Sequence, residues 1–155
     1  MTSPQAATGS GAADINSWHL TASRSSHPSA APTLLGPGDL LREIAAGIGA
    51  VTVPHGLDGS RPSRLTREMV LSTPAYDVWV MHWPAGEAAA LHTHDAHVAF
   101  HVVDGAVTEE RPSGDRVLRL ELRTGDTSVV APGVPHRLVS IVDTTTVHVH
   151  AKELD

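Results

Sequence analysis

The sequence predicts an all-β domain of the antiparallel sandwich or small-barrel class, with one or two short N-terminal helices. From Pro62 onward the chain is a series of short segments rich in β-branched and aromatic residues, the composition of strands. Breakers such as PAGE, PSGD, TGD and APGVP separate these segments, as turns separate strands. Upstream, one stretch carries apolar residues at helical spacing.

A chain of 155 residues with 41% hydrophobic residues is long enough for one ordinary domain. Residues 1–33 are rich in Ala, Ser, Thr, Pro and Gly and hold few large apolar side chains. Such a composition buries too little surface to offset the entropy lost on ordering. We therefore expect a flexible N-terminal arm at 1–33 and a single domain at 34–155.

The charge pattern excludes several kinds of partner. The formal net charge is −6, and Lys and Arg do not cluster, so nothing indicates a surface for nucleic acid or for anionic membranes. The N-terminus has no basic start followed by an apolar run, and no apolar stretch is long enough to cross a bilayer. We expect a cytoplasmic protein, either a monomer or a homodimer, with no nucleic-acid or membrane partner.

The elements can be placed in order along the chain. GDLLREIAAGIGA at 38–50 has leucines and isoleucines at helical spacing, and Asp39 is its candidate N-cap. The predicted strands are REMVLS (67–72), YDVWVMHW (76–83), HVAFHVVD (97–104), RVLRLELR (116–123), TSVVA (127–131), HRLVSIV (136–142) and TTVHVHA (145–151). Folds of this size double or close their sheets to cover exposed edges, which leaves an interior pocket for a small ligand.

Histidines are the candidate metal ligands. Four of them fall within ten residues of GEAAALHTHDAHVAFHVVDG (86–105). Residues two apart on a strand share a face, so His92 and His94 can bind one ion, and His136 offers a third nitrogen after a Gly/Pro turn. His97 and His101 have the opposite parity to position 98, whose side chain is expected to face the metal. Both histidines are therefore expected to point away from the metal. The chain has no cysteine, which leaves histidine and carboxylate as ligands.

The spacing of these residues resembles that of the cupin superfamily. The first cupin motif is matched by Gly86, His92, His94 and Gly105, with Val98 in the usual glutamate position. The second is matched by Gly125, Gly133 and His136, with Ala131 and Ser140 in place of the usual proline and asparagine. The resemblance covers residues 38 to 155 and implies a jelly-roll β-barrel.

Because Val98 cannot bind a metal, the ligand set is three neutral imidazoles. Among cupins this set looks like that of the thiol dioxygenases, the cysteine dioxygenase group. The resemblance implies Fe(II) held by His92, His94 and His136, with a small thiol carboxylic acid and O2 as partners and a sulfinate as product. Nickel, manganese and zinc stay open, because the order of affinities does not by itself select iron.

The same resemblance implies roles for further residues. Arg67 matches an arginine that pairs with the substrate carboxylate, a role that suits the planar guanidinium. Trp83 and Val98 would line the substrate pocket. The family carries a Ser-x-His-x-Tyr run on its last strand, and the aligned residues here are Thr146, which would contact substrate, and His148 and His150, which would orient the reactants or move a proton.

Departures from the family pattern bear on the substrate. His150 replaces the tyrosine, and no cysteine stands at Val98 or Ala99, so the Cys-Tyr crosslink of some members cannot form. Leu65 stands where a family tyrosine often lies. These changes argue against cysteine and leave open another thiol acid, such as 3-mercaptopropionate, or a different substrate altogether.

Three other functions stay open. The first is a three-His metal cupin acting on a non-thiol substrate such as a diketone or a phenolic acid. The second is a non-catalytic cupin that binds a small ligand or a metal. The third, zinc-dependent hydrolysis, is disfavoured because no acidic base is evident near the histidines.

Overall fold

A computed structural model describes residues 35–153, so the predicted arm at 1–33 lies outside the described residues. The helix is α1 (Pro37–Val51). The strands are β1 (Thr66–Ser72), β2 (Tyr76–Trp83), β3 (Val98–Asp104), β4 (Ala106–Ser113), β5 (Arg116–Arg123), β6 (Thr127–Val130), β7 (Arg137–Ser140) and β8 (Thr144–Ala151). Among residues 35–153, no helix combines the length and the apolar character needed to cross a membrane.

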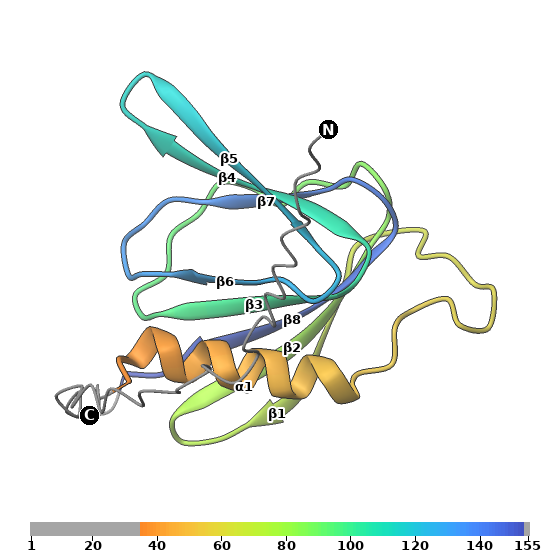
Figure 1. Cartoon of the computed structure of the whole chain (residues 1–155), viewed down its shortest axis with the longest axis horizontal. Helices are drawn as coiled ribbons and strands as arrows, with labels where there is room; N and C mark the ends of the chain where they lie inside the picture. The colour runs from red at the N-terminus through yellow and green to blue at the C-terminus, as the bar shows by residue number, and fades with distance from the viewer. Residues whose placement is uncertain (1–34, 154–155) are drawn as a thin grey trace, which may run out of the picture. The chain divides into compact units, whose positions relative to one another are not determined.

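The strands form two antiparallel sheets that face each other as a jelly-roll-like sandwich (Figure 1). The larger sheet has the order β1-β2-β8-β3-β6, and the smaller has the order β5-β4-β7. The fold class predicted from the sequence, an all-β jelly roll with an N-terminal helix, is confirmed. Most neighbouring strands are distant in sequence, so short turns do not determine which strands pair. The pairing depends instead on the apolar face that each strand buries.

Alternation along the central strands gives the larger sheet two different faces. Val147 and Val149 of β8 point outward and pack with Ala99 of β3 against α1, which lies along this face (Figure 1). Side chains of the opposite parity point inward, toward the smaller sheet. The inner core is formed by Trp83, Phe100, Val102, Val107, Leu122, Val130 and Leu138.

Two local predictions need correction. The helix begins at Pro37, whose fixed φ suits the first helical position, and the N-cap is Gly36. Asp39 is therefore not the N-cap; it lies in the first turn, where its Oδ2 accepts a 3.1 Å hydrogen bond from the Gly36 N–H. The strand β4 was not predicted, because the EERP run within it has low β propensity. Pairing with β5 and β7 overrides that propensity.

Helix α1 approaches the sheet closely at a glycine. Gly49 is buried, and a Cβ at this position would overlap Cδ2 of the His101 ring and lie 2.9 Å from its Nε2. The His101 ring cannot easily move aside, because its Nδ1 lies 2.7 Å from the Thr127 hydroxyl and the residue is only 9% exposed. Gly47, two residues earlier in the helix, is exposed, and a Cβ there would have no neighbouring atom within 4 Å.

Gly49→Ala is expected to lower the free energy of unfolding by about 1–2 kcal/mol, because overpacking outweighs the better helix propensity of alanine. Gly47→Ala, the matched control, should raise stability by up to about 1 kcal/mol. Urea unfolding followed by circular dichroism measures both values. Equal stabilisation of the two variants would show that α1 does not press on His101 as described.

Candidate metal centre

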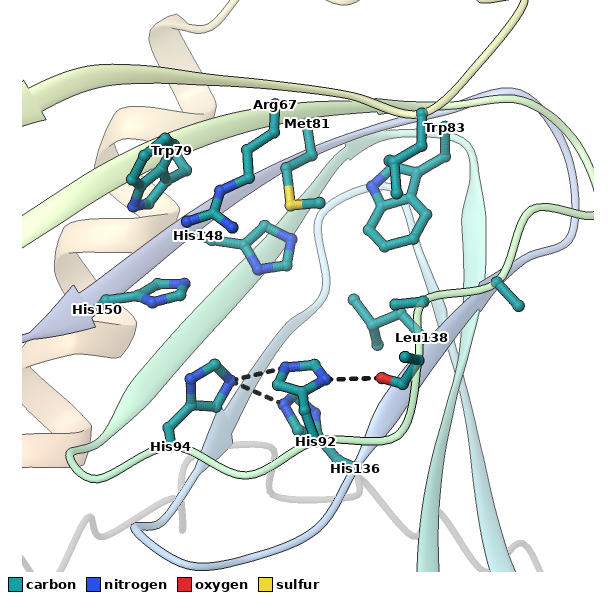
Figure 2. Close-up of a pocket in the computed structure, with 14 residues that line it drawn as sticks. Arg67, Trp79, Met81, Trp83, His92, His94, His136, Leu138, His148 and His150 are labelled. Atoms are coloured by element: carbon teal, nitrogen blue, oxygen red, sulfur yellow. Dashed lines mark hydrogen bonds between the residues drawn. The ribbon is translucent and has the colours of Figure 1, made fainter.

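A cavity of about 690 Å³ opens between the two sheets. Its lining includes the predicted residues Arg67, Trp83, His92, His94, His136, His148 and His150. Figure 2 shows Arg67, Trp79 and Met81 on one side of this cavity and His92, His94 and His136 on the other. The volume lies in the range of small-molecule sites.

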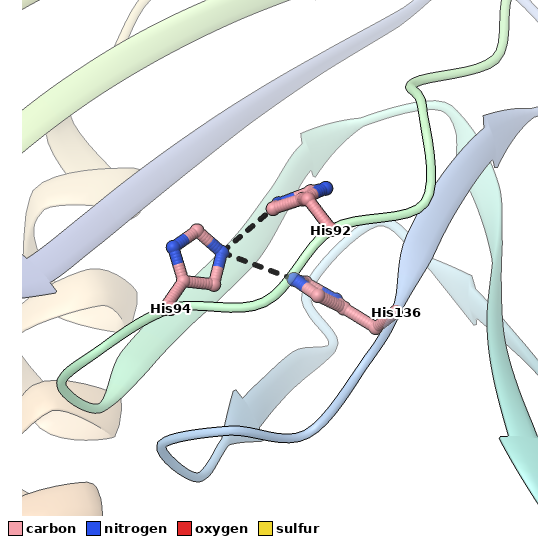
Figure 3. A group of neighbouring side chains, drawn as sticks. All are labelled: His92, His94 and His136. Atoms are coloured by element: carbon pink, nitrogen blue, oxygen red, sulfur yellow. Dashed lines mark hydrogen bonds between the residues drawn. The ribbon is translucent and has the colours of Figure 1, made fainter.

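Three imidazole nitrogens converge at one end of the cavity (Figure 3). His94 Nε2 lies 3.0 Å from His92 Nε2 and 3.1 Å from His136 Nε2. Two nitrogens bound at right angles to one ion, each about 2.1 Å from it, would be about 3.0 Å apart. The spacing of the side chains therefore fits a shared metal ion.

The main chain sets the separation of two of these histidines. The His92 N–H donates to the His136 carbonyl at 3.0 Å, and the His136 N–H donates back at 2.9 Å. The third is held through its carbonyl, which accepts a 2.9 Å hydrogen bond from the Gly133 N–H. The prediction that His92 and His94 lie on a strand needs correction, since this stretch is an extended loop with an isolated bridge at His92.

Hydrogen bonding selects the nitrogen that His92 presents, and burial keeps His94 uncharged. Nδ1 of His92 lies 2.8 Å from the Ala90 carbonyl and can only donate to it, which leaves a lone pair on Nε2. The pKa of His94 is lowered to about 4. Burial is the largest cause, followed by the charges that the neighbouring His150 and His92 imidazoles would carry if protonated. The His94 ring is thus neutral near pH 7, which is the state that a metal ion requires of an imidazole ligand.

Arg67 brings positive charge into the cavity. Its guanidinium carbon lies 3.9 Å from the centroid of the Trp79 ring, a cation–π arrangement. Within residues 35–153 Arg67 forms no ion pair. No residue described in the cavity lining is a carboxylate, so the guanidinium is available to an anionic ligand.

The inward face of β8 forms a hydrogen-bonded chain with β2. Trp83 Nε1 donates to the Thr146 hydroxyl at 2.9 Å, and that hydroxyl lies 2.9 Å from His148 Nε2. The His148 ring is stacked on Phe100, with centroids 5.5 Å apart. Burial lowers the pKa of His148 well below its ordinary value, so the ring is held neutral and fixed in orientation.

Two predicted pocket residues lie outside the main cavity lining. Thr146 is fully buried and acts on the cavity through Trp83 and His148. Val98, 2% exposed, borders a second, smaller cavity of about 310 Å³. His94 and His150 border both cavities, and their rings meet edge to face with centroids 5.0 Å apart.

One residue at this site was missed from the sequence. Glu109 of β4 is 1% exposed, and its Oε1 lies 3.4 Å from His136 Nδ1. Burial alone would raise its pKa, but the contacts with His136, Ser128 and Arg111 outweigh burial and lower the pKa of Glu109 below its ordinary value. No motif indicates this carboxylate. Glu109 could have been placed near the histidines only if the strand β4 had been predicted from the sequence.

Residues 79–151 match the family model described as the Cupin domain. The chain is similar to a solved cupin superfamily protein from Desulfitobacterium hafniense, with 8% identity over 61% of this chain and 83% of that chain and a TM-score of 0.55. An RmlC-like cupin from Desulfovibrio desulfuricans has 19% identity over 64% and 96% of the two chains and a TM-score of 0.52. KdgF from Halomonas sp. has 23% identity over 61% and 85% and a TM-score of 0.52. No curated protein matches the sequence.

The two-sheet fold, the histidine arrangement and the domain match agree. Residues 79–151 thus correspond to a cupin domain, and the chain has the cupin fold. The structural similarities concern the fold, and none of the proteins named above is described as a thiol dioxygenase.

Loss of a residue that hydrogen-bonds to a metal ligand typically weakens metal binding by roughly 10- to 100-fold. His136→Ala removes a ligand itself, so it is expected to weaken metal binding by more than this. His97→Ala is the control, because His97 lies beside Gly38 of α1 rather than among the converging nitrogens. Elemental analysis after anaerobic Fe(II) loading and desalting reports the difference. Full iron occupancy in His136→Ala would remove this residue from the ligand set.

Proposed function

We propose that the protein is a mononuclear non-haem iron thiol dioxygenase that oxidises a small thiol carboxylic acid to its sulfinate. The observation that carries the proposal is the presence, in one cavity, of three converging Nε2 atoms and an arginine without an ion-pair partner among residues 35–153. His92, His94 and His136 would hold the iron, and Arg67 would bind the carboxylate.

When bound, Fe(II) would supply the Lewis acidity that favours a thiolate at neutral pH and the redox chemistry that dioxygen requires. The overall reaction, RSH + O2 → RSO2⁻ + H⁺, places both oxygen atoms on sulfur. The electrons lost by sulfur equal those gained by dioxygen, so no external reductant is needed.

The cavity walls support an anionic substrate without an amino group. Arg67 can accept a carboxylate in the bidentate geometry that guanidinium favours. An ammonium group would find no carboxylate partner in the described lining, and it would lie near the Arg67 cation. This balance favours 3-mercaptopropionate or a similar acid over cysteine and cysteamine.

The remaining polar groups of the cavity position the reactants. His148 is held by Thr146 on one side and by the Phe100 ring on the other. Burial, followed by the Arg67 charge, lowers the pKa of His150 to about 4. Both imidazoles are therefore neutral near pH 7 and can take part in hydrogen bonds with a substrate that lies between Arg67 and the three ligand histidines.

A second candidate function rests on the size and apolar character of the cavity. About 690 Å³ exceeds what a three-carbon thiol acid fills, and Trp79, Met81 and Trp83 line the wall beside Arg67. These features favour a larger carboxylate with an aromatic or aliphatic body. The second candidate is a three-His metal cupin that acts on such a non-thiol acid.

Oxygen uptake separates the two candidates. Iron-loaded protein is expected to consume O2 with 3-mercaptopropionate and to form the sulfinate in equal amount, with lower kcat/KM for cysteine and for cysteamine. Mass spectrometry of the product is the measurement. Uptake with a phenolic acid alone would favour the second candidate, and absence of turnover with any thiol would refute the first.

Arg67→Ala is expected to raise KM for 3-mercaptopropionate by about 10- to 100-fold, because hydrogen bonds to charged groups each contribute a few kcal/mol. KM for cysteamine, which lacks a carboxylate, should change little. Arg64→Ala is the control, because Arg64 is exposed and does not line the cavity. An equal loss for both thiols would show that Arg67 does not bind a carboxylate.

A further inference from the structure

A buried carboxylate faces the back of one ligand histidine. Oε1 of Glu109 lies 3.4 Å from Nδ1 of His136, and the side chains are 1% and 3% exposed. Among residues 35–153, His136 Nδ1 is the one buried side-chain nitrogen or oxygen without a hydrogen-bond partner. A neutral ring whose Nε2 lone pair points into the site carries its proton on this nitrogen. A buried donor thus lies just beyond hydrogen-bonding distance of a carboxylate.

The carboxylate is fixed by groups on both sides. Ser128 Oγ donates to Oε2 at 2.7 Å, and Arg111 Nε donates to Oε1 at 2.8 Å. Arg111 is itself anchored, because its Nη2 donates to the Val129 carbonyl at 3.0 Å. The ion pair with Arg111 compensates the charge of Glu109, whose carboxylate otherwise could not stay ionised in this buried place.

We infer that Glu109 is a positioning residue of the metal centre: when an ion is bound, its carboxylate accepts a hydrogen bond from the Nδ1–H of His136 and thereby presents Nε2 to the ion. The inference rests on the metal centre proposed above but not on the identity of the substrate. A carboxylate behind a ligand histidine fixes the ring orientation and makes the ligand more basic.

This role also accounts for the missing carboxylate among the ligands. Val98 occupies the position where many cupins have a glutamate, and it is buried and apolar. The three imidazoles alone leave the full charge of the ion uncompensated. Glu109 brings a carboxylate, whose charge Arg111 partly offsets, to the site from the opposite sheet, and it acts through the His136 ring rather than by direct contact with the ion.

The strand β4 supplies a matched control beside Glu109. Glu110 is the next residue, and its side chain pairs with Arg119 at 2.8 Å and with Arg137 at 2.6 Å. Glu110→Gln removes the same charge from the same strand and releases Arg137, the neighbour of His136, but it removes no side-chain partner of His136 itself. A difference between the two variants therefore reports the contact with His136 and not a general change in net charge.

The experiment measures Zn(II) and Fe(II) affinity by chelator competition, the latter without oxygen, for wild type, Glu109→Gln and Glu110→Gln. We expect about 10- to 100-fold weaker binding of both ions in Glu109→Gln and less than about a threefold change in Glu110→Gln. The iron midpoint potential should rise in Glu109→Gln, because the carboxylate stabilises the more highly charged ferric ion.

The apo proteins provide the readout for a purely structural role. If Glu109→Gln lowers the apo melting temperature but leaves both affinities and the potential at wild-type values, Glu109 only ties β4 to β6 and the inference fails. If Glu109→Gln does not fold because Arg111 is left unpaired, Glu109→Gln with Arg111→Gln removes both charges and is measured in the same way. Wild-type protein that binds neither ion would refute the metal centre itself, whereas tight binding without thiol oxidation would refute the proposed reaction alone.

Discussion

The period-two alternation of β8 is the constraint on which both the fold and the site depend. Val147 and Val149 point outward and bury α1 against the sheet, whereas Thr146 and His148 point inward. A register slip of one residue would exchange these sets and place imidazoles under the helix. Because β8 pairs with both β2 and β3 along most of its length, its register is fixed from two sides.

The polar groups of the site come from separate parts of the chain and meet where the two sheets face each other. The larger sheet supplies Arg67 and the inward histidines of β8, and the smaller sheet supplies Glu109. The link between the sheets is itself polar, since Arg111 of β4 bonds to the backbone of β6. Buried polar networks of this kind specify one arrangement only when every member is satisfied. His136 Nδ1 is the exception among the described residues.

The features that could be predicted from the sequence are those whose signal lies within a short segment of the chain. The YDVWVMHW and RVLRLELR segments were predicted with the bounds of β2 and β5, because their alternation is visible within a few residues. The three converging histidines follow from motif spacing. Parity placed Thr146 inward, but it could not show that its hydroxyl is already shared between Trp83 and His148. Glu109 was missed because β4 is stabilised by pairing with β5 and β7 rather than by its own composition.

The reciprocal hydrogen bonds between the backbones of His92 and His136 give the centre a scaffold that does not need an ion. In small zinc domains the ion itself folds the ligand loops. Here main-chain hydrogen bonds set the separation of His92 and His136, so this part of the site does not depend on an ion for its spacing. An ion bound by these histidines could exchange without undoing that pairing, so the metal found at the site would depend on supply rather than on the folding of the chain.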